Sequence, residues 1–207
     1  VGSEMCIRDR LDAVHYAKST ASVDENRVYA VGVSGGGHAS MLLAARAPEI
    51  WAGVSAWCGI SDIAAWHAET TASDRVRYAK EIEAACGGRP EIGTQAGHEA
   101  KRRSPLSWLN SNLKINLDLS HGLHDGRTGS VPFTHSLNAF NKVAAEQHQI
   151  SAEQIERFYQ TQQSFDGDTV SDGLFRDKPV VFRRSAGNSR VTIFDGGHEI
   201  IHEAALN

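Results

Sequence analysis

Three residue types that together make a nucleophile reactive occur at turns of this chain: a serine, an aspartate and a histidine. Ser34 stands in Gly32-Val-Ser-Gly-Gly36, a G-x-S-x-G sequence, and Asp125 and His198 follow it in that order. A serine hydroxyl is a weak nucleophile near neutral pH, so it needs a histidine base within reach and a carboxylate that orients the base. This set of residues therefore predicts acyl transfer through a covalent intermediate.

The elements expected around Ser34 suit this role. Residues 28–33 form an apolar run rich in β-branched side chains, which is typical of a strand buried on both faces. Residues 39–45 then read as a helix that Pro48 ends. A serine between a strand and a helix projects from a tight turn in which flanking side chains would clash. The same turn aims the backbone N–H of Gly35 at the oxygen that becomes negative, so Gly35 is expected to be an oxyanion donor.

Strands and helices alternate along the rest of the chain. Strands are expected at residues 28–33, 50–58, 113–120, 180–182 and 191–194, helices at 11–19, 61–67, 74–86, 132–150, 151–163 and 198–206, an irregular stretch at 87–112 and a loop at 165–178. This order predicts an α/β fold with a mainly parallel sheet flanked by helices on both faces. Since ligands bind at the carboxyl ends of such strands, the sheet should gather Ser34, Asp125 and His198 at one edge.

Composition narrows the class of protein. The 207 residues suggest one domain or part of one, and 41% hydrophobic with 22% charged residues is ordinary for a globular protein. A net charge of -4 gives no reason to expect nucleic acid or a membrane surface as partner, and no apolar run could span a bilayer. The three cysteines match neither a disulfide framework nor a metal motif. Oligomeric state and compartment stay open.

With these motifs the chain resembles the α/β-hydrolase superfamily, in particular the catalytic domain of prolyl-oligopeptidase-like (S9-type) serine peptidases and related carboxylesterases. The matching segments are Gly32-Val-Ser-Gly-Gly-Gly-His38, His121-Gly-Leu-His-Asp125 followed by Val131-Pro132, and Gly196-Gly-His-Glu199. The resemblance implies Ser34 as nucleophile, Asp125 as orienting carboxylate and His198 as general acid–base, with an ester or peptide substrate and no cofactor. Residues 126–130 and 151–178 are longer than the corresponding intervals of that family.

The N-terminus reads differently from the rest. Met5-Cys-Ile-Arg-Asp-Arg10 resembles a translated sequencing adapter, so we expect residues 1–10 to be non-native. Residues 11–207 would then be the C-terminal part of an α/β-hydrolase catalytic domain. The family's first strands, and the loop that gives the second oxyanion donor, would precede Leu11.

Two other functions compete with the triad. His198-Glu199-Ile-Ile-His202 matches H-E-x-x-H, in which two histidines one helical turn apart hold zinc and the glutamate is the base. That reading leaves the Ser34 turn unexplained, so no metal is expected. A non-catalytic hydrolase-fold module is the other alternative.

The substrate pocket is the least defined part of the site. Trp57, Trp66 and His67 follow the end of an expected strand, so they are candidates for its lining, although tryptophans are as often ordinary core residues.

The truncation hypothesis predicts that residues 11–207 alone are an inactive fragment. Loss of one oxyanion donor costs about 10²–10³ in rate. Expressed beside the completed gene and assayed on an activated acetate ester, the shorter protein should turn over far more slowly. Equal turnover from both would show that the domain lacks nothing upstream.

Overall fold

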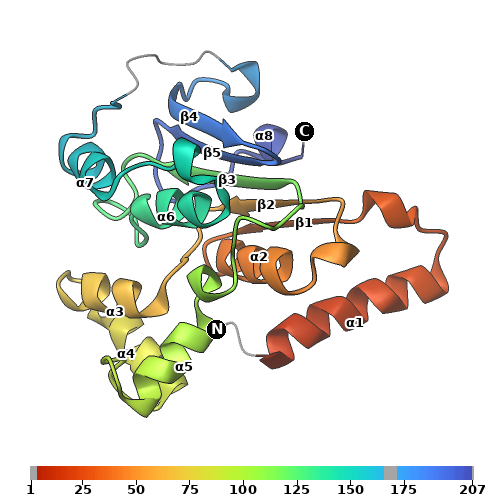
Figure 1. Cartoon of the computed structure of the whole chain (residues 1–207), viewed down its shortest axis with the longest axis horizontal. Helices are drawn as coiled ribbons and strands as arrows, with labels where there is room; N and C mark the ends of the chain where they lie inside the picture. The colour runs from red at the N-terminus through yellow and green to blue at the C-terminus, as the bar shows by residue number, and fades with distance from the viewer. Residues whose placement is uncertain (1–3, 166–171, 207) are drawn as a thin grey trace.

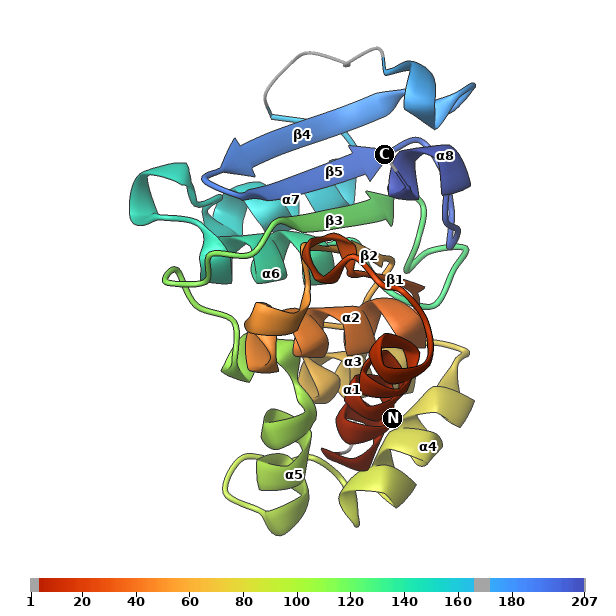
Figure 2. The ribbon, with the colours of Figure 1, turned by 90° about the vertical axis from the view of Figure 1, so that its right-hand side faces the viewer.

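The centre of the molecule is a five-stranded sheet. The computed structural model describes residues 4–165 and 172–206 (Figure 1). The strands are β1 (Tyr29–Val33), β2 (Gly53–Trp57), β3 (Leu117–Gly122), β4 (Val180–Ala186) and β5 (Ser189–Phe194), in the order β1-β2-β3-β5-β4. Adjacent strands from β1 to β5 are parallel, whereas β4 runs antiparallel to β5, as their opposed arrows in Figure 2 show. The mainly parallel sheet is confirmed.

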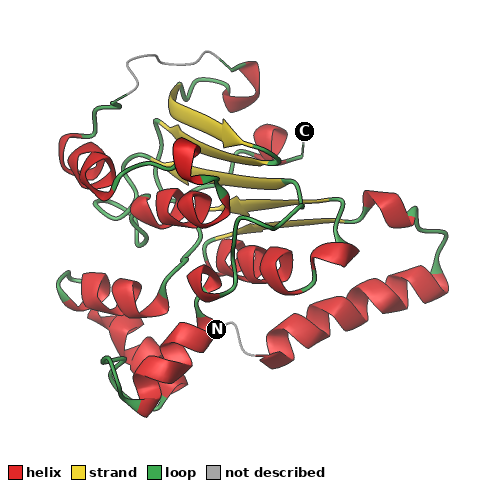
Figure 3. Ribbon diagram, viewed as in Figure 1, coloured by secondary structure: helices red, strands yellow, loops and turns green. Residues whose placement is uncertain are grey.

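Helices surround this sheet (Figure 3). They are α1 (Glu4–Thr20), α2 (Gly35–Arg46), α3 (Ile63–Thr71), α4 (Val76–Cys86), α5 (Gln95–Arg103), α6 (Thr134–Val143), α7 (Ala152–Thr161) and α8 (His202–Ala205). Short 3-10 turns connect several of them. On one face, α2 packs on β1 and β2, and α6 packs on β3 and β5.

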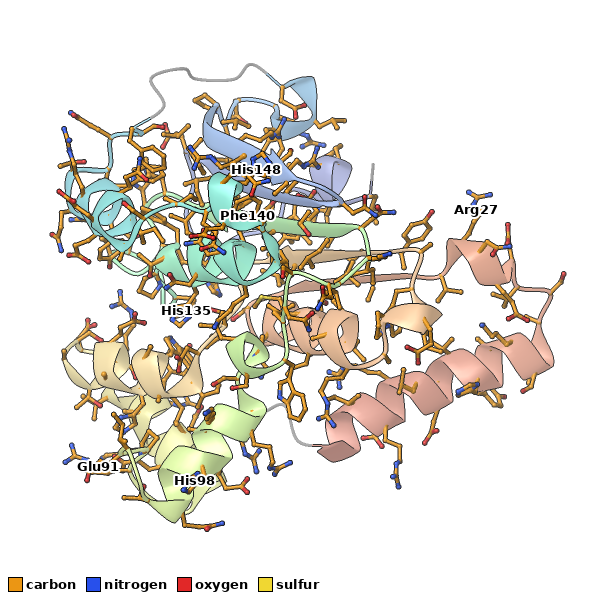
Figure 4. All side chains as sticks on the ribbon, in the orientation of Figure 1. Arg27, Glu91, His98, His135, Phe140 and His148 are labelled. Carbon is orange, nitrogen blue, oxygen red and sulfur yellow. The ribbon has the colours of Figure 1, made fainter. Side chains whose placement is uncertain are left out.

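Alternating side chains assign the two faces of the sheet. Ala56 and Ile193 belong to the main apolar cluster with α2 and with the fully buried Phe140 of α6 (Figure 4). The next residue along each strand, Trp57 and Phe194, belongs to a second cluster with α8. Helices therefore flank both faces, as expected.

The second face is open near the amino ends of the strands. There Tyr29 is 59% exposed and Val31 is 41% exposed. The expectation that the first strand is buried on both faces is therefore wrong, because α2 covers one side of β1 while Tyr29 and Val31 on the other side are exposed.

The chain between β2 and β3 forms three helices that cluster together. These helices, α3, α4 and α5, gather at the lower left of Figure 1 around an apolar core of their own. The irregular stretch expected at 87–112 is wrong for its central part, which forms α5. This helix escaped notice because the buried residues on it are the small Ala96 and Ala100, while Thr94 caps it by accepting a hydrogen bond from the N–H of Gly97.

The segment after β3 returns to the sheet through two helices and a hairpin. Residues 134–143 form α6, so the helix expected at 132–150 ends earlier. Ser151 caps α7 and forms a capping box with Gln154. The hairpin of β4 and β5 turns at Gly187-Asn188, and β4 is longer than expected. Residues 166–171 of the expected loop lie outside the described part of the chain, and Gly173–Phe175 form a 3-10 turn.

The two ends also differ from expectation. The first helix begins at Glu4 rather than at residue 11, and Ile7 packs into the main core. Whether residues 1–10 are native concerns the origin of the DNA and stays a prediction. At the other end the helix expected at 198–206 is wrong for residues 198–201, which form a loop before α8. Among the described residues, no helix has both the length and the apolar character needed to cross a membrane.

Candidate active site

Ser34 occupies a strained turn between β1 and α2. Its φ of 59° and ψ of -120° fall in a region that non-glycine residues rarely adopt. A Cβ at Gly32 would collide with the backbone of Gly36, so this position requires glycine. A Cβ at Gly36 meets nothing within 4 Å, whereas a Cβ at Gly37 would collide with the carbonyl oxygen of Trp57. Gly35 is the first residue of α2, and its N–H therefore has no partner within the helix.

Asp125 is fully buried in the loop after β3 and accepts four hydrogen bonds. Oδ1 accepts from the backbone N–H of Gly126 at 2.9 Å and of Val131 at 3.0 Å. Oδ2 lies 2.6 Å from Nδ1 of His198 and 3.1 Å from Nε2 of His121. The interval 126–130 thus closes a loop around the carboxylate. Every lone pair of the buried charge has a donor, which is the condition for burying it.

These contacts set the charge state of Asp125. Burial alone would raise the pKa of the Asp125 carboxyl, but the hydrogen bonds from His121 and His198 outweigh it and hold this pKa well below its usual range. Asp125 is therefore a carboxylate at neutral pH, able to stabilise a positive charge on His198.

The loops that carry Asp125 and His198 touch each other at their bases. The N–H groups of Leu123 and His124 donate to the carbonyls of Phe194 and Gly196. A Cβ at Gly122 would collide with the carbonyl oxygen of Gly197, so a side chain there would force the loops apart. His198 itself is one quarter exposed, with Nδ1 turned to Asp125.

Cys58 links the Ser34 turn to the His198 loop. The N–H of Ser34 donates to the carbonyl of Trp57, and the next residue, Cys58, places its Sγ 3.4 Å from the carbonyl oxygen of Glu199. The two turns therefore meet across the end of β2. Within the described part of the chain no hydrogen bond joins Ser34 to His198, and such bonds are often long before substrate binds.

Cys58, His121 and Asp125 form the one group of possible metal ligands in the described residues. The ligand atoms lie within 4.8 Å of one another. Burial, with a smaller contribution from Asp125, raises the pKa of the Cys58 thiol to about 12, whereas a cysteine ligand must be a thiolate. Hydrogen bonds already occupy His121 and Asp125, so these side chains satisfy one another as a polar network.

A cavity of about 190 Å³ opens beside Ser34. Its walls are largely apolar and come mainly from α2, α3 and α4, with Ile60 from the loop before α3 and Arg103 from α5. They are Ser34, Gly35, His38, Ile60, Ile63, Trp66, Tyr78, Glu81, Ile82, Ala85, Cys86 and Arg103. Burial lowers the pKa of His38 to about 4, so this histidine is neutral at pH 7 and its Nδ1–H can donate to the carbonyl of Ile60.

The three residues expected to line the substrate pocket, Trp57, Trp66 and His67, lie in different parts of the structure. Trp66 lines the cavity, packs against Tyr78 with ring centroids 5.2 Å apart, and donates its indole N–H to the carbonyl of Ser130. Trp57 is fully buried beneath α8 instead. His67 is buried between α3 and α4, with Nε2 2.9 Å from a carboxylate oxygen of Glu83, and is not part of the cavity wall.

The H-E-x-x-H segment lacks the helix that its zinc chemistry needs. His198 lies in the loop and His202 starts α8, so they are not one turn apart on a helix. Glu199 accepts hydrogen bonds from Lys178 and from the N–H of Gly197 at 2.9 Å each. The carboxylate holds the loop in shape rather than facing a metal.

The sequence did not reveal two parts of the site. One is His121, whose part in the site the motif around Asp125 does not indicate. Its spacing of four residues from Asp125 was the available signal. The other is the wall of α4 beside the cavity, formed by Tyr78 and Ile82. That helix was expected, but nothing in its pattern tells which element its apolar side would face.

Comparison with known proteins gives a family match. The model of the prolyl oligopeptidase family matches residues 3–157. This match contains Ser34 and Asp125 and stops before His198. No curated protein matches the sequence.

Several solved structures of peptidases are similar to this chain in fold. An acylaminoacyl peptidase of Pyrococcus horikoshii has a TM-score of 0.53 at 20% identity, and prolyl oligopeptidase B of Galerina marginata has 0.53 at 18%. A putative dipeptidyl aminopeptidase IV of Bacteroides ovatus has 0.51 at 23%. Each comparison covers 66% of this chain but only 20%, 18% and 17% of those chains. The matched part of this chain thus spans about a fifth of their length.

The lowered pKa of Asp125 predicts an acid-dependent loss of stability. Because the folded-state pKa lies below the unfolded value of 3.8, the ionised carboxylate stabilises the fold above that pH, and the contribution fades as the pH falls toward the folded-state pKa. The difference in free energy of unfolding between wild type and Asp125→Asn should therefore be largest above about pH 4 and shrink toward pH 2. Urea titrations across this range measure it. An Asp12→Asn surface control should track wild type throughout, and a constant gap for Asp125→Asn would contradict the pKa direction.

Proposed function

The chain belongs to the prolyl oligopeptidase family, and we propose that it is a serine hydrolase in which Ser34, His198 and Asp125 act as a catalytic triad on an ester or peptide bond. The observation that carries the proposal is the 2.6 Å contact between Nδ1 of His198 and the buried Asp125 carboxylate, which leaves Nε2 as the ring nitrogen able to act as base.

The chemistry would run in two halves. Ser34 Oγ attacks the substrate carbonyl carbon while Nε2 of His198 takes its proton, and Asp125 stabilises the imidazolium that forms. The tetrahedral intermediate collapses when His198 returns that proton to the leaving group, which departs as an alcohol or amine. Water then attacks the acyl-enzyme with His198 again as base, and the acid product leaves with Ser34 restored.

Gly35 supports the developing negative charge. Its N–H opens α2 and has no helical partner, and the partial positive field of the helix N-terminus adds to it. We assign Gly35 as one oxyanion donor. A second donor is expected from a loop between an early strand and its helix, as in other hydrolases of this fold.

The cavity beside Ser34 would take the side chain or acyl group next to the scissile bond. Its apolar walls favour an uncharged group, and its volume of about 190 Å³ favours a compact one. The relatives are named as peptidases of acylaminoacyl and prolyl type, so a peptide bond is the first candidate and a carboxylic ester the second. A non-catalytic hydrolase-fold module is the remaining alternative.

Covalent reaction at Ser34 is the decisive prediction. A fluorophosphonate probe should label the protein expressed from its complete gene, and Ser34→Ala should abolish labelling and lower ester turnover by about 10⁴-fold or more. Ser19→Ala, at the exposed end of α1, is the matched control and should label normally. Parent-rate hydrolysis by Ser34→Ala would refute the triad and favour another mechanism, and no labelling of wild type would favour a binding module.

Trp66 should limit the size of the group that the cavity accepts. Trp66→Ala removes the part of the wall that packs against Tyr78, so kcat/KM for a long-chain acyl ester relative to acetate should rise by about tenfold. Tyr16→Ala, an exposed aromatic of α1, should leave that ratio unchanged. An unchanged ratio in Trp66→Ala would place the acyl group elsewhere.

A further inference from the structure

A second histidine contacts the carboxylate that orients His198. His121 is fully buried near the end of β3. Its Nε2 lies 3.1 Å from Oδ2 of Asp125 and 2.9 Å from the carbonyl oxygen of Val131, and its Nδ1 lies 2.8 Å from the hydroxyl of Ser136. All of its polar atoms are thus engaged, in a chain that runs from Ser136 through His121 and Asp125 to His198.

The partners of His121 decide which nitrogen carries the hydrogen. Nε2 faces two oxygens that can only accept, the Asp125 carboxylate and the Val131 carbonyl, so Nε2 must be the donor. Nδ1 faces a hydroxyl, which can donate to it. Oδ2 of Asp125 therefore accepts from two imidazoles at once, at 2.6 Å from His198 and at 3.1 Å from His121.

We propose that His121 is a positioning residue that limits how strongly Asp125 holds a proton on His198. Its catalytic meaning rests on the proposed triad. A hydrogen bond to a carboxylate stabilises the anion and draws charge from the shared oxygen. With His121 in place, Oδ2 is a weaker hydrogen-bond acceptor toward an imidazolium at His198.

Loss of the hydrogen bond from His121 should shift the protonation of His198 in one direction. The oxygen would then carry more negative charge toward His198, and the imidazolium would be favoured. His198 would take up its second proton at a higher pH. Replacing a residue that only fills space would lower stability without moving this titration.

Other titratable groups near Asp125 and His198 are the same in all the variants compared. Cys58 and Tyr159 lie in the field of Asp125. The pair of Lys178 with Glu199 and the pair of His124 with Asp195 flank the His198 loop. None of them makes a hydrogen bond to His121 in the described residues, so a changed titration of His198 is traceable to the lost donor.

The experiment is a histidine ring titration on the full chain with ¹⁵N-labelled histidine. Signals of His198 are assigned by their loss in His198→Asn. His121→Leu should raise the midpoint of the His198 titration by about half to one pH unit. His135→Leu is the matched control and should leave the midpoint in place. His135 of α6 is also buried but lies on the side of α6 toward α3 (Figure 4), and its Nε2 is 3.0 Å from a carboxylate oxygen of Glu69.

A conservative variant separates hydrogen bonding from packing. His121→Gln keeps an N–H donor, so its midpoint should stay within about 0.3 pH unit of wild type, well short of the shift that a lost hydrogen bond produces. An unchanged midpoint in folded His121→Leu, or an equal rise in His121→Gln, would overturn the inference. Should His121→Leu not fold, the wild-type spectrum still decides: a hydrogen on Nδ1 rather than on Nε2 of His121 overturns it.

The outcome is separable from that of the proposed function. The titration needs neither substrate nor turnover, whereas covalent labelling of Ser34 tests the triad. A shifted midpoint with an unreactive Ser34 would keep the His121 hydrogen bond and reject the hydrolase, and a reactive Ser34 with an unmoved midpoint would do the reverse.

Discussion

A carboxylate without solvent contact is the constraint that shapes this structure. Burying the charge of Asp125 is costly unless each oxygen meets donors, and its four donors come from two backbone N–H groups and two imidazoles. One of them, His198, comes from the separate loop after β5. The chain can satisfy the carboxylate only if the loops after β3 and β5 approach closely, which the bare backbone of Gly122 permits.

The order of strands in the sheet determines how the chain brings His198 to Asp125. His198 follows β5, and β5 pairs with β3 because the chain inserts a hairpin whose other strand, β4, takes the edge. On the other side, the indole of Trp66 in α3 binds the carbonyl of Ser130, within the loop that surrounds Asp125. The loop that carries Asp125 is therefore supported from both sides: by α3, which precedes β3, and by the hairpin that follows it.

How far the sequence predicts this structure depends on the range of the signal. The Ser34 turn was predictable because strand, glycine and helix patterns stand together within twenty residues, and the parallel sheet followed from their alternation. The alanine-faced α5 was not, since its buried side chains are small and few. The helix expected at residues 198–206 was right only for its last part, α8. Trp57 and Trp66 look equivalent in the sequence, yet one is buried beneath α8 and the other lines a cavity, because which face each residue presents depends on tertiary packing.

The same limit applies to the polar network. That His121 shares an oxygen with His198 depends on loop closure over some seventy residues, which no local pattern encodes. The motif that contains His121 and Asp125 places the two residues close together, but it does not show which groups donate hydrogen bonds and which accept them. Hydrogen bonds of this kind follow from three-dimensional distance and from the number of acceptors around each nitrogen.

The β4–β5 hairpin also bears on how the last strand finds its place. In the sheet, Asp118 of β3 meets Arg190 of β5, 72 positions later, with a separation of 2.6 Å between carboxylate and guanidinium. Closing so long a loop around one isolated strand carries a large entropic cost before any contact compensates for it. A hairpin with a two-residue turn forms locally and within microseconds. The hairpin that contains β5 can thus dock onto β3 as a preformed unit. Only one register is compatible with the core, since a slip by one residue would turn Ile193 to the wrong face of the sheet.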